Sequence, residues 1–175
     1  RRIANYMANV IIKRGDFELV PMTKAHVMQV FTDIAPYSAA EYEEPDLFYA
    51  LDSMQEDADC MILEKNNVAV QLIGLQAIGN QQVYMWSSFT NQMAKHWMGV
   101  VRFSPLIIKY IHQTYYEINL NVSPDNEGTI NWLSWMGFIP SGYVEDDKGE
   151  ALVHFVRCNP DRKNVYALSS RPVMH

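Results

Sequence analysis

The chain has 175 residues, a formal net charge of −6, and a composition that is 49% hydrophobic and 19% charged. These values suit one globular domain with a full hydrophobic core and exclude a disordered chain. No apolar run approaches the roughly 18 residues of a membrane span, so we expect no membrane partner. Phosphate binding depends on clustered Lys and Arg, so the acidic balance argues against a nucleic-acid partner. Cys60 and Cys158 lack metal-ligand spacing, so we expect no metal. In a reducing cytosol the two cysteines are expected to be buried free thiols, and a lone disulfide is the alternative.

The two ends of the chain are expected to lie outside the domain. The three parts are an N-terminal arm at 1–15, a domain at 16–158 and a C-terminal tail at 159–175. Arg1-Arg2-Ile3 can be encoded by a bacterial ribosome-binding sequence, and Met7 follows like a natural start. Residues 1–6 are therefore either translated leader or an ordinary basic arm. The leader interpretation implies a bacterium or a bacterial virus as the source.

The first half of the domain predicts a strand, two helices and a three-strand meander. The expected strands are 17–20, 60–63, 68–78 and 83–86. Thr23 can cap a first helix that Pro36 ends, and a second helix begins near Pro45. Asn66-Asn67 suits a hairpin turn because Asn tolerates positive φ, and the strand that follows is long enough for a bulge near Gly74.

The second half predicts helix, strand, helix and a final hairpin. Residues 87–99 read as irregular or as leading into a helix, and residues 100–116 read as helix. Within that helix Pro105 either makes a kink or starts the helix behind a Ser104 cap. The strand 118–122 alternates cleanly. Ser123 then caps a helix with Pro124 in its first turn, and Gly137 ends that helix in a left-handed conformation. The hairpin pairs 138–144 with 151–157.

One stretch carries a family resemblance. Residues 122–138 combine a strand end, Asn126 just inside a helix, Ile130, Leu133 and a closing Gly137-Phe138. This pattern, with the element order above it, resembles the GNAT acyltransferases from about residue 16 to residue 158. Residues 83–140 resemble a narrower group, the GNAT-like internal virion or head-assembly proteins of podovirus-type tailed phages.

The resemblance implies an α+β fold: a mixed, mostly antiparallel sheet of about six to seven strands with helices on both faces. It also implies acetyl-CoA or another acyl-CoA as ligand, held where the fourth and fifth strands of the family splay apart. Acyl transfer needs backbone N–H groups for the pyrophosphate, a donor for the thioester carbonyl, a base for the amine and an acid for the thiolate.

This chain departs from the family pattern at the positions that serve these needs. The glycine-rich phosphate loop corresponds to Asn91–Gly99, which has one glycine. At the position where the family often has a Tyr that protonates the leaving thiolate, this chain has Leu133. The strand that usually carries a Glu or Asp base offers Tyr84 and Trp86, and neither is a base near neutral pH.

Substitute groups can still be named. The candidate catalytic residues are Tyr84, Glu117 and Tyr116, with Tyr115 and His96 as further stand-ins. The candidate cofactor-binding residues are Asn126, Trp86, Lys95, His96 and Gly99. Half-buried packing explains most of these side chains equally well, and Asn126 could simply cap its helix.

Two functions therefore stay open. The first is an acyl-CoA-binding, N-acyltransferase-like protein of phage origin. The second is a non-catalytic virion, assembly or host-interaction protein that keeps the scaffold and contacts phage or host proteins through its aromatic surface. Both place the protein in the host-cell cytoplasm or the virion interior.

Overall fold

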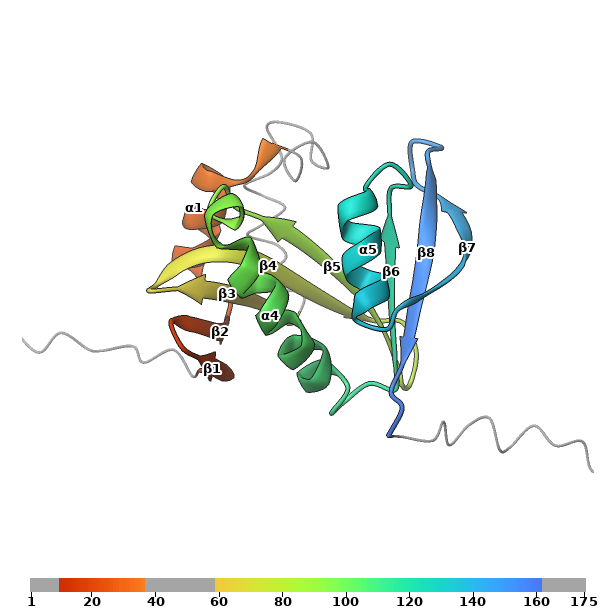
Figure 1. Ribbon diagram of the computed structural model, residues 1–175, viewed down its shortest axis with the longest axis horizontal. Coiled ribbons are helices and arrows are strands. Elements are labelled where there is room, and N and C mark those ends of the chain that lie inside the picture. The colour runs from red at the N-terminus through yellow and green to blue at the C-terminus, as the bar shows by residue number, and fades with distance from the viewer. Residues whose placement is uncertain (1–9, 37–58, 162–175) are drawn as a thin grey trace, which may run out of the picture. The chain divides into compact units, whose positions relative to one another are not determined.

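The computed structural model describes residues 10–36 and 59–161. Their strands form an eight-stranded sheet in the order β1-β2-β3-β4-β5-β6-β8-β7 (Figure 1). The strands are β1 Ile12–Arg14, β2 Phe17–Pro21, β3 Asp59–Lys65, β4 Val68–Ala77, β5 Gln82–Phe89, β6 Glu117–Val122, β7 Ile139–Glu145 and β8 Ala151–Cys158. The helices are α1 Lys24–Asp33, α4 Met93–Ile111 and α5 Glu127–Trp135. The expected α+β class and mostly antiparallel sheet are confirmed; β1, inside the expected N-terminal arm, raises the strand number above seven.

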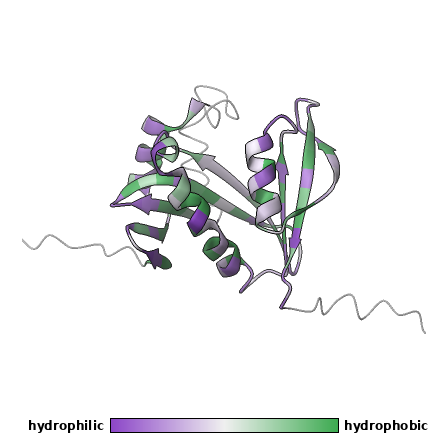
Figure 2. Ribbon diagram, viewed as in Figure 1, coloured by the Kyte–Doolittle hydropathy of each residue, from purple (hydrophilic) through white to green (hydrophobic). Residues whose placement is uncertain are grey.

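The chain divides into two compact units. Unit 1 comprises the described residues up to Gln76 together with Met85–Ile107, and unit 2 comprises Ala77–Tyr84 together with the described residues from Ile108 onward. In Figure 2 the hydrophobic colour follows long stretches of the strands in each unit, as a packed core in each requires. The expected helix near Pro45 lies outside the described residues.

In unit 1, helices cover both faces of the sheet. Val20 pairs with Ile62, and Ile62 pairs with Leu72, so these side chains share one face. They pack in one cluster with Val27 and Val30 of α1. Strand residues alternate between faces, so Phe17 and Leu19 point to the other face, where Phe17 contacts Gly99 of α4. The expectation of helices on both faces is met within this unit.

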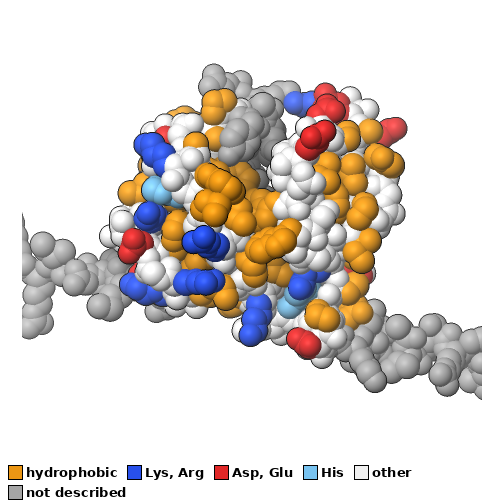
Figure 3. Space-filling model, viewed as in Figure 1, with side chains coloured by type: hydrophobic (Ala, Val, Ile, Leu, Met, Phe, Trp, Pro, Cys, Tyr) orange, Lys and Arg blue, Asp and Glu red, His pale blue; other side chains and the backbone are white. Residues whose placement is uncertain are grey.

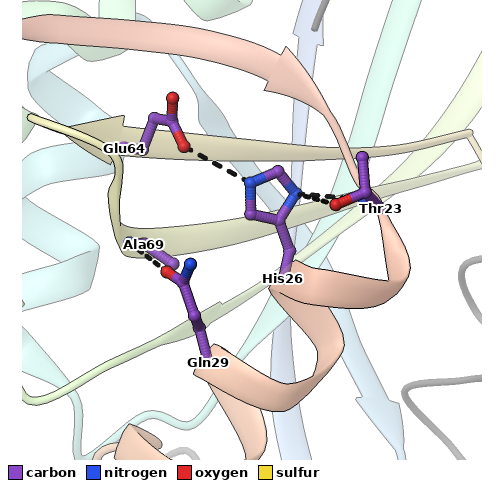
Figure 4. A network of polar contacts seen from close by, with 5 residues as sticks. All are labelled: Thr23, His26, Gln29, Glu64 and Ala69. Carbon is purple, nitrogen blue, oxygen red and sulfur yellow. Dashed lines mark hydrogen bonds and ion pairs between the residues drawn. The ribbon is translucent and has the colours of Figure 1, made fainter. Parts of the chain in front are cut away.

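Helix α1 begins with a capping box that uses a histidine. The expected N-cap, Thr23, has extended backbone geometry, and its N–H donates to His26 Nδ1 at 3.0 Å. His26 therefore fills the role that Glu or Gln usually has three residues after the cap. On its other side, His26 Nε2 lies 3.3 Å from Glu64 Oε2 in the buried layer between α1 and β3 (Figure 4). The network ties the start of α1 to the sheet.

A bulge interrupts the β3–β4 pairing at Val70, not near Gly74. Leu63 pairs with Gln71 and Glu64 pairs with Ala69, which leaves Val70 without an opposite residue. The backbone groups that the bulge frees find partners elsewhere. Ala69 N–H donates to Gln29 Oε1 at 3.0 Å (Figure 4), and Thr90 Oγ1 donates to Ala69 O at 2.8 Å. The bulge thereby anchors the loop that leads into α4.

The boundaries of α4 differ from the sequence prediction. The helix begins at Met93 and ends at Ile111, and β5 continues to Phe89, so of the two expectations for residues 87–99 the irregular one is wrong and residues 93–99 already belong to the helix. Pro105 lies inside the helix. Ser104 is not a cap, because its hydroxyl donates to Val100 O one turn back, at 2.7 Å.

Unit 2 contains the antiparallel strands β6, β8 and β7, with α5 joining β6 to β7. The first residue of β5, Gln82, pairs with Glu117 in the parallel β5–β6 ladder. The end of α5 is as predicted: Gly137 has φ +86°, and Phe138 N–H donates to Leu133 O at 3.0 Å. With Gly137 N–H donating to Ser134 O, these bonds form a Schellman motif.

The remaining general expectations concern membranes, metals and thiols. None of the described helices is long and apolar enough to cross a membrane. Within residues 10–36 and 59–161, no group of three or more His, Cys, Asp or Glu side chains is placed to hold a metal ion. Cys60 is buried and Cys158 is exposed, so the expectation of burial holds for Cys60 alone.

Candidate functional site

A row of polar side chains crosses one face of unit 2. Strand alternation places Glu117, Asn119 and Asn121 of β6 on the same face. His154 of β8 pairs with Asn121 across the ladder and therefore shares this face. Its Nδ1 lies 2.7 Å from Asn121 Oδ1, and its Nε2 lies 3.1 Å from Asn119 Oδ1.

The row continues to a carboxylate. Asn119 Nδ2 donates to Glu117 Oε1 at 2.9 Å, and Gln82 Nε2 of β5 donates to the same oxygen at 3.1 Å. Tyr84, the residue of β5 that pairs with Asn119, is half-buried on the same face. The structure thus brings together two of the predicted catalytic residues, Tyr84 and Glu117, on one strand pair. We call Glu117, Asn119, Asn121 and His154 the polar row.

The polar row lies on the face of the sheet that α5 does not cover. Arg157 of β8 pairs with Ile118, one residue away from the row on each strand. The Nε of Arg157 donates to Met136 O at the end of α5, at 2.8 Å. Residues of opposite parity point to opposite faces, so α5 packs over Ile118 and Arg157, and the polar row faces the other way.

Tyr116, the third catalytic candidate, has a different neighbour. The pKa of its phenol is raised, first by the adjacent Cys158 and then by burial. A raised pKa makes Tyr116 a weaker proton donor near neutral pH. Tyr116 comes directly before the first residue of β6, next to the exposed Cys158 thiol. Tyr116 is therefore a weaker candidate for the proton-donating acid than the residues of the polar row.

The start of α4 is closed by bonds within the chain. Gln92 N–H donates to Thr90 Oγ1 at 3.3 Å, and Met93 N–H donates to Thr90 O at 3.1 Å. Lys95 N–H donates to Gln92 O. The carboxylate of Asp33 accepts from the side-chain amides of Asn91 at 3.1 Å and Gln92 at 2.9 Å. The first N–H groups of a helix usually form a phosphate-binding site. Here most of them already donate within the chain, and the carboxylate of Asp33 lies beside them.

Two basic residues, Lys95 and His96, lie in the first turn of α4. Lys95 is exposed, and in Figure 3 Lys and Arg side chains gather over unit 1 in the left half of the view. The ring of His96 meets Phe17 edge-on, 6.4 Å between centroids. The pKa of His96 is lowered, first by burial and then by Lys65 and Lys95. His96 is thus biased toward its neutral form, which binds anions weakly.

Gly99 and Trp86 have packing roles. A Cβ on Gly99 would lie 2.3 Å from a ring carbon of Phe17, so a side chain cannot stand there without displacing the ring. A Cβ on Gly74 would likewise lie 2.0 Å from the Trp86 indole, which packs against the α1 side of the core. These contacts explain both residues without a ligand.

Asn126 is the N-cap of α5. Its Oδ1 accepts from Thr129 N–H at 3.1 Å, and the helix begins at Glu127. The predicted cap, Ser123, instead accepts through its carbonyl from Asn126 N–H, in the turn that precedes the helix. Pro124 therefore lies before α5 and not in its first turn. Capping is the role that the contacts of Asn126 show.

The architecture has counterparts among solved structures. A ribosomal-protein-S5-alanine acetyltransferase from Vibrio fischeri matches 87% of this chain and 98% of its own, with a TM-score of 0.67 and 12% identity. A GNAT-family acetyltransferase from Bacillus anthracis matches 84% of this chain and 97% of its own, with a TM-score of 0.64 and 13% identity. This chain has the GNAT fold. At such identities the likeness establishes the fold and leaves the activity open.

A third structure with the GNAT fold includes a ligand. It is a ribosomal L7/L12 alpha-N-protein acetyltransferase in complex with coenzyme A, with 10% identity, a TM-score of 0.64, and coverage of 85% of this chain and 97% of its own. No protein-family model matches the sequence, and no curated protein matches it either.

A GNAT fold raises the question of whether the residues here fit an acyl-CoA. At the start of α4 they do not fit its pyrophosphate, because Thr90 and Gln92 already accept from the N–H groups of Gln92, Met93 and Lys95, and Asp33 adds negative charge. Gly99 has no side chain, which could have allowed a phosphate to approach closely. The ring of Phe17 occupies that space instead.

Asn119, Asn121 and His154 are not among the site residues predicted from the sequence. The alternation of Glu117-Ile-Asn-Leu-Asn-Val122 does place the three polar residues on one face, which is a usable signal. His154 could be added only from the β6–β8 register, which pairs residues 33 positions apart in the sequence. That register depends on tertiary packing and not on local pattern.

Proposed function

We propose that the protein transfers an acyl group from a thioester to an amine, and that the polar row of unit 2 moves the proton. The GNAT fold supports the reaction class, and the polar row is the observation that carries the proposal. It joins a carboxylate, two amides and an imidazole by contacts of 2.7–3.1 Å on a sheet face that α5 leaves uncovered.

The proposed reaction needs one proton to change place. The amine nitrogen attacks the thioester carbonyl, the N–C bond forms and the C–S bond breaks. The amine loses one proton and the departing thiolate gains one, so a group that accepts and returns a proton balances the step. The residue at the position of the family's acidic Tyr, Leu133, is buried and cannot do this. An imidazole can, because its two states are both accessible near neutral pH.

We propose acyl-CoA as one donor, with little help from its nucleotide. The closed start of α4 motivates this, because hydrogen bonds to a charged group are worth about 1.5–3 kcal/mol each, and the donors there are already used. The test compares kcat/KM for acetyl-CoA with that for S-acetylpantetheine on one amine acceptor. Values within about tenfold support the proposal, whereas a pyrophosphate clamp of even two such bonds predicts a loss of more than a hundredfold.

The alternative is a non-catalytic protein on a GNAT scaffold, as in the phage virion or head-assembly group, acting on phage or host proteins inside the host cell or the virion. The observation that favours it is the same closed start of α4, with Asp33 beside it. Thermal unfolding with millimolar acetyl-CoA separates the two. A ligand at 100 times its Kd stabilises by about 2.7 kcal/mol, whereas a scaffold without a donor site shows no shift.

A further inference from the structure

The orientation of the Asn119 amide is fixed by its neighbours. A carboxylate only accepts hydrogen bonds, so the atom of Asn119 that lies 2.9 Å from Glu117 Oε1 must be the donating Nδ2. The carbonyl Oδ1 then faces His154 Nε2, at 3.1 Å. Asn119 is 5% exposed, so a turned amide would bury its oxygen against the carboxylate oxygen of Glu117, and neither of these two atoms can donate.

This orientation fixes one proton on His154. Asn119 Oδ1 can only accept, so His154 Nε2 carries a hydrogen in both the neutral and the charged imidazole. The exchangeable proton is therefore the one on Nδ1, which lies 2.7 Å from Asn121 Oδ1. When Nδ1 is protonated it donates to that oxygen. When it is not, a half-turn of the Asn121 amide presents Nδ2 as a donor, so neither state loses its partner.

The surroundings of His154 leave it approachable. On β7 the residue that pairs with it is Gly142, and a Cβ there would meet no atom of the described residues within 4 Å. Among the described residues, the other charged or titratable groups on this face of β5, β6 and β8 are Tyr84, Glu117, which is reached through Asn119, and Cys158, which pairs with Glu117. Arg157 of β8 points to the face that α5 covers.

We propose that His154 is the acid–base group of the polar row: it exchanges a proton at Nδ1, while Asn119 and Glu117 hold Nε2–H in place. This assignment rests on the proposed function and deepens it. His154 Nδ1 takes the proton that the amine nitrogen loses as the N–C bond forms, and gives it to the sulfur as the C–S bond breaks. Asn121 is displaced by the incoming amine or turns with the proton, and Asn119 and Glu117 are positioning residues.

The kinetic test uses His154→Gln, in which a side-chain amide can still donate to Asn119 Oδ1 but cannot exchange a proton. We expect kcat to fall by about 10²–10⁴ with KM little changed. In Asn121→Asp the new carboxylate only accepts, so it holds the proton on Nδ1 and should also slow turnover. Thermal melts of both variants serve as the control that they fold. A His154→Gln enzyme with unchanged kcat overturns the assignment.

The closing experiment needs no turnover. Nitrogen-15 spectra of the imidazole rings of the full chain report which ring nitrogen carries hydrogen, with His154→Gln identifying the signal. We expect the neutral His154 ring to be protonated at Nε2, and expect Asn119→Leu to let the Nδ1–H form appear. A neutral ring protonated at Nδ1 overturns the inference, whether or not acyl transfer occurs. Absence of acyl transfer from every donor, beside the expected tautomer, contradicts the proposed function alone.

Discussion

The ring of Phe17 fills the space that a side chain on Gly99 would need. A Cβ on Gly99 would lie 2.3 Å from Cζ and 2.4 Å from Cε2 of that ring. Phe17 also lies 6.2 Å from Phe103 between ring centroids, and Lys65 Nζ lies 5.6 Å above its face. The contact joins β2 to α4, so it belongs to the core of unit 1.

Gly99→Ala should therefore destabilise the protein by about 1–3 kcal/mol, the usual cost of overpacking, despite the better helix propensity of Ala. Urea unfolding measures it. The matched control is Gly128→Ala on α5, where the nearest atom to a new Cβ is Asn126 Oδ1 at 4.0 Å. That change should be neutral or slightly stabilising. If Gly99→Ala were as stable as the parent but bound acetyl-CoA less well, the missing side chain of Gly99 would serve the close approach of a ligand and not core packing.

Gly137 tests the left-handed end of α5. Its φ is +86°, and a Cβ there would meet Arg157 Nε at 3.5 Å, an ordinary contact, so the cost of a side chain comes from the backbone. Gly137→Val should cost more than about 1–2 kcal/mol, because β-branched residues tolerate this region poorly. Gly137→Asn should cost less, since Asn adopts positive φ more readily. Equal stabilities of the two variants in urea unfolding would contradict this explanation.

Such local features were the most predictable from sequence. Asn66, Asn67 and Gly137 have the positive φ that their residue types favour, and Thr23 caps its helix as expected. These predictions depend on a few neighbouring residues, whose conformational preferences are strong enough to decide the structure without tertiary contacts.

Features that depend on distant contacts were missed or misplaced. The start of α4 depends on Thr90, which reaches across to the β4 bulge at Ala69 and Val70. The bulge itself falls at Val70 because Gln29 and Thr90 can satisfy its backbone there. The family resemblance assigned Asn126, Trp86, Lys95, His96 and Gly99 to a cofactor site, and that assignment stays a prediction, because a resemblance carries positions but not the side-chain contacts that surround them.

The role of Asn126 can be measured through stability and binding together. Loss of its bond to Thr129 N–H in Asn126→Ala should cost about 1 kcal/mol, within the usual range for N-caps, and Asn126→Asp should cost little. Acetyl-CoA affinity, measured by calorimetric titration, should change by less than about twofold in both. A tenfold loss of affinity with unchanged stability would show that Asn126 serves a ligand site.

His112 should make stability depend on pH. Its Nδ1 donates to Tyr115 O at 3.0 Å, and its Nε2 is buried without a hydrogen-bond partner among the described residues. The pKa of His112 is lowered, chiefly by burial and further by Arg157, so the folded state binds fewer protons than the unfolded chain. Its contribution to stability is complete above the unfolded value of about 6.5 and is lost as the pH falls below it, down to the folded value.

Urea midpoints at pH 7.5 and pH 5.5 measure this effect. We expect the parent to lose more stability between the two than His112→Gln does. His96→Gln is the control, because His96 is half-exposed and its titration should matter less. An equal loss in the parent and in His112→Gln would assign the acid sensitivity to other groups.

The most direct test of the central claim is the rate of thiol release from acetyl-CoA with a panel of primary amines, followed for the parent and for His154→Gln. The account predicts release above the amine-only rate for at least one acceptor, reduced by about 10²–10⁴ in a His154→Gln protein that melts like the parent. Release that is equal in both proteins would contradict the role of the polar row. No release by the parent at millimolar acetyl-CoA, together with no thermal shift, would contradict acyl transfer and favour the non-catalytic scaffold.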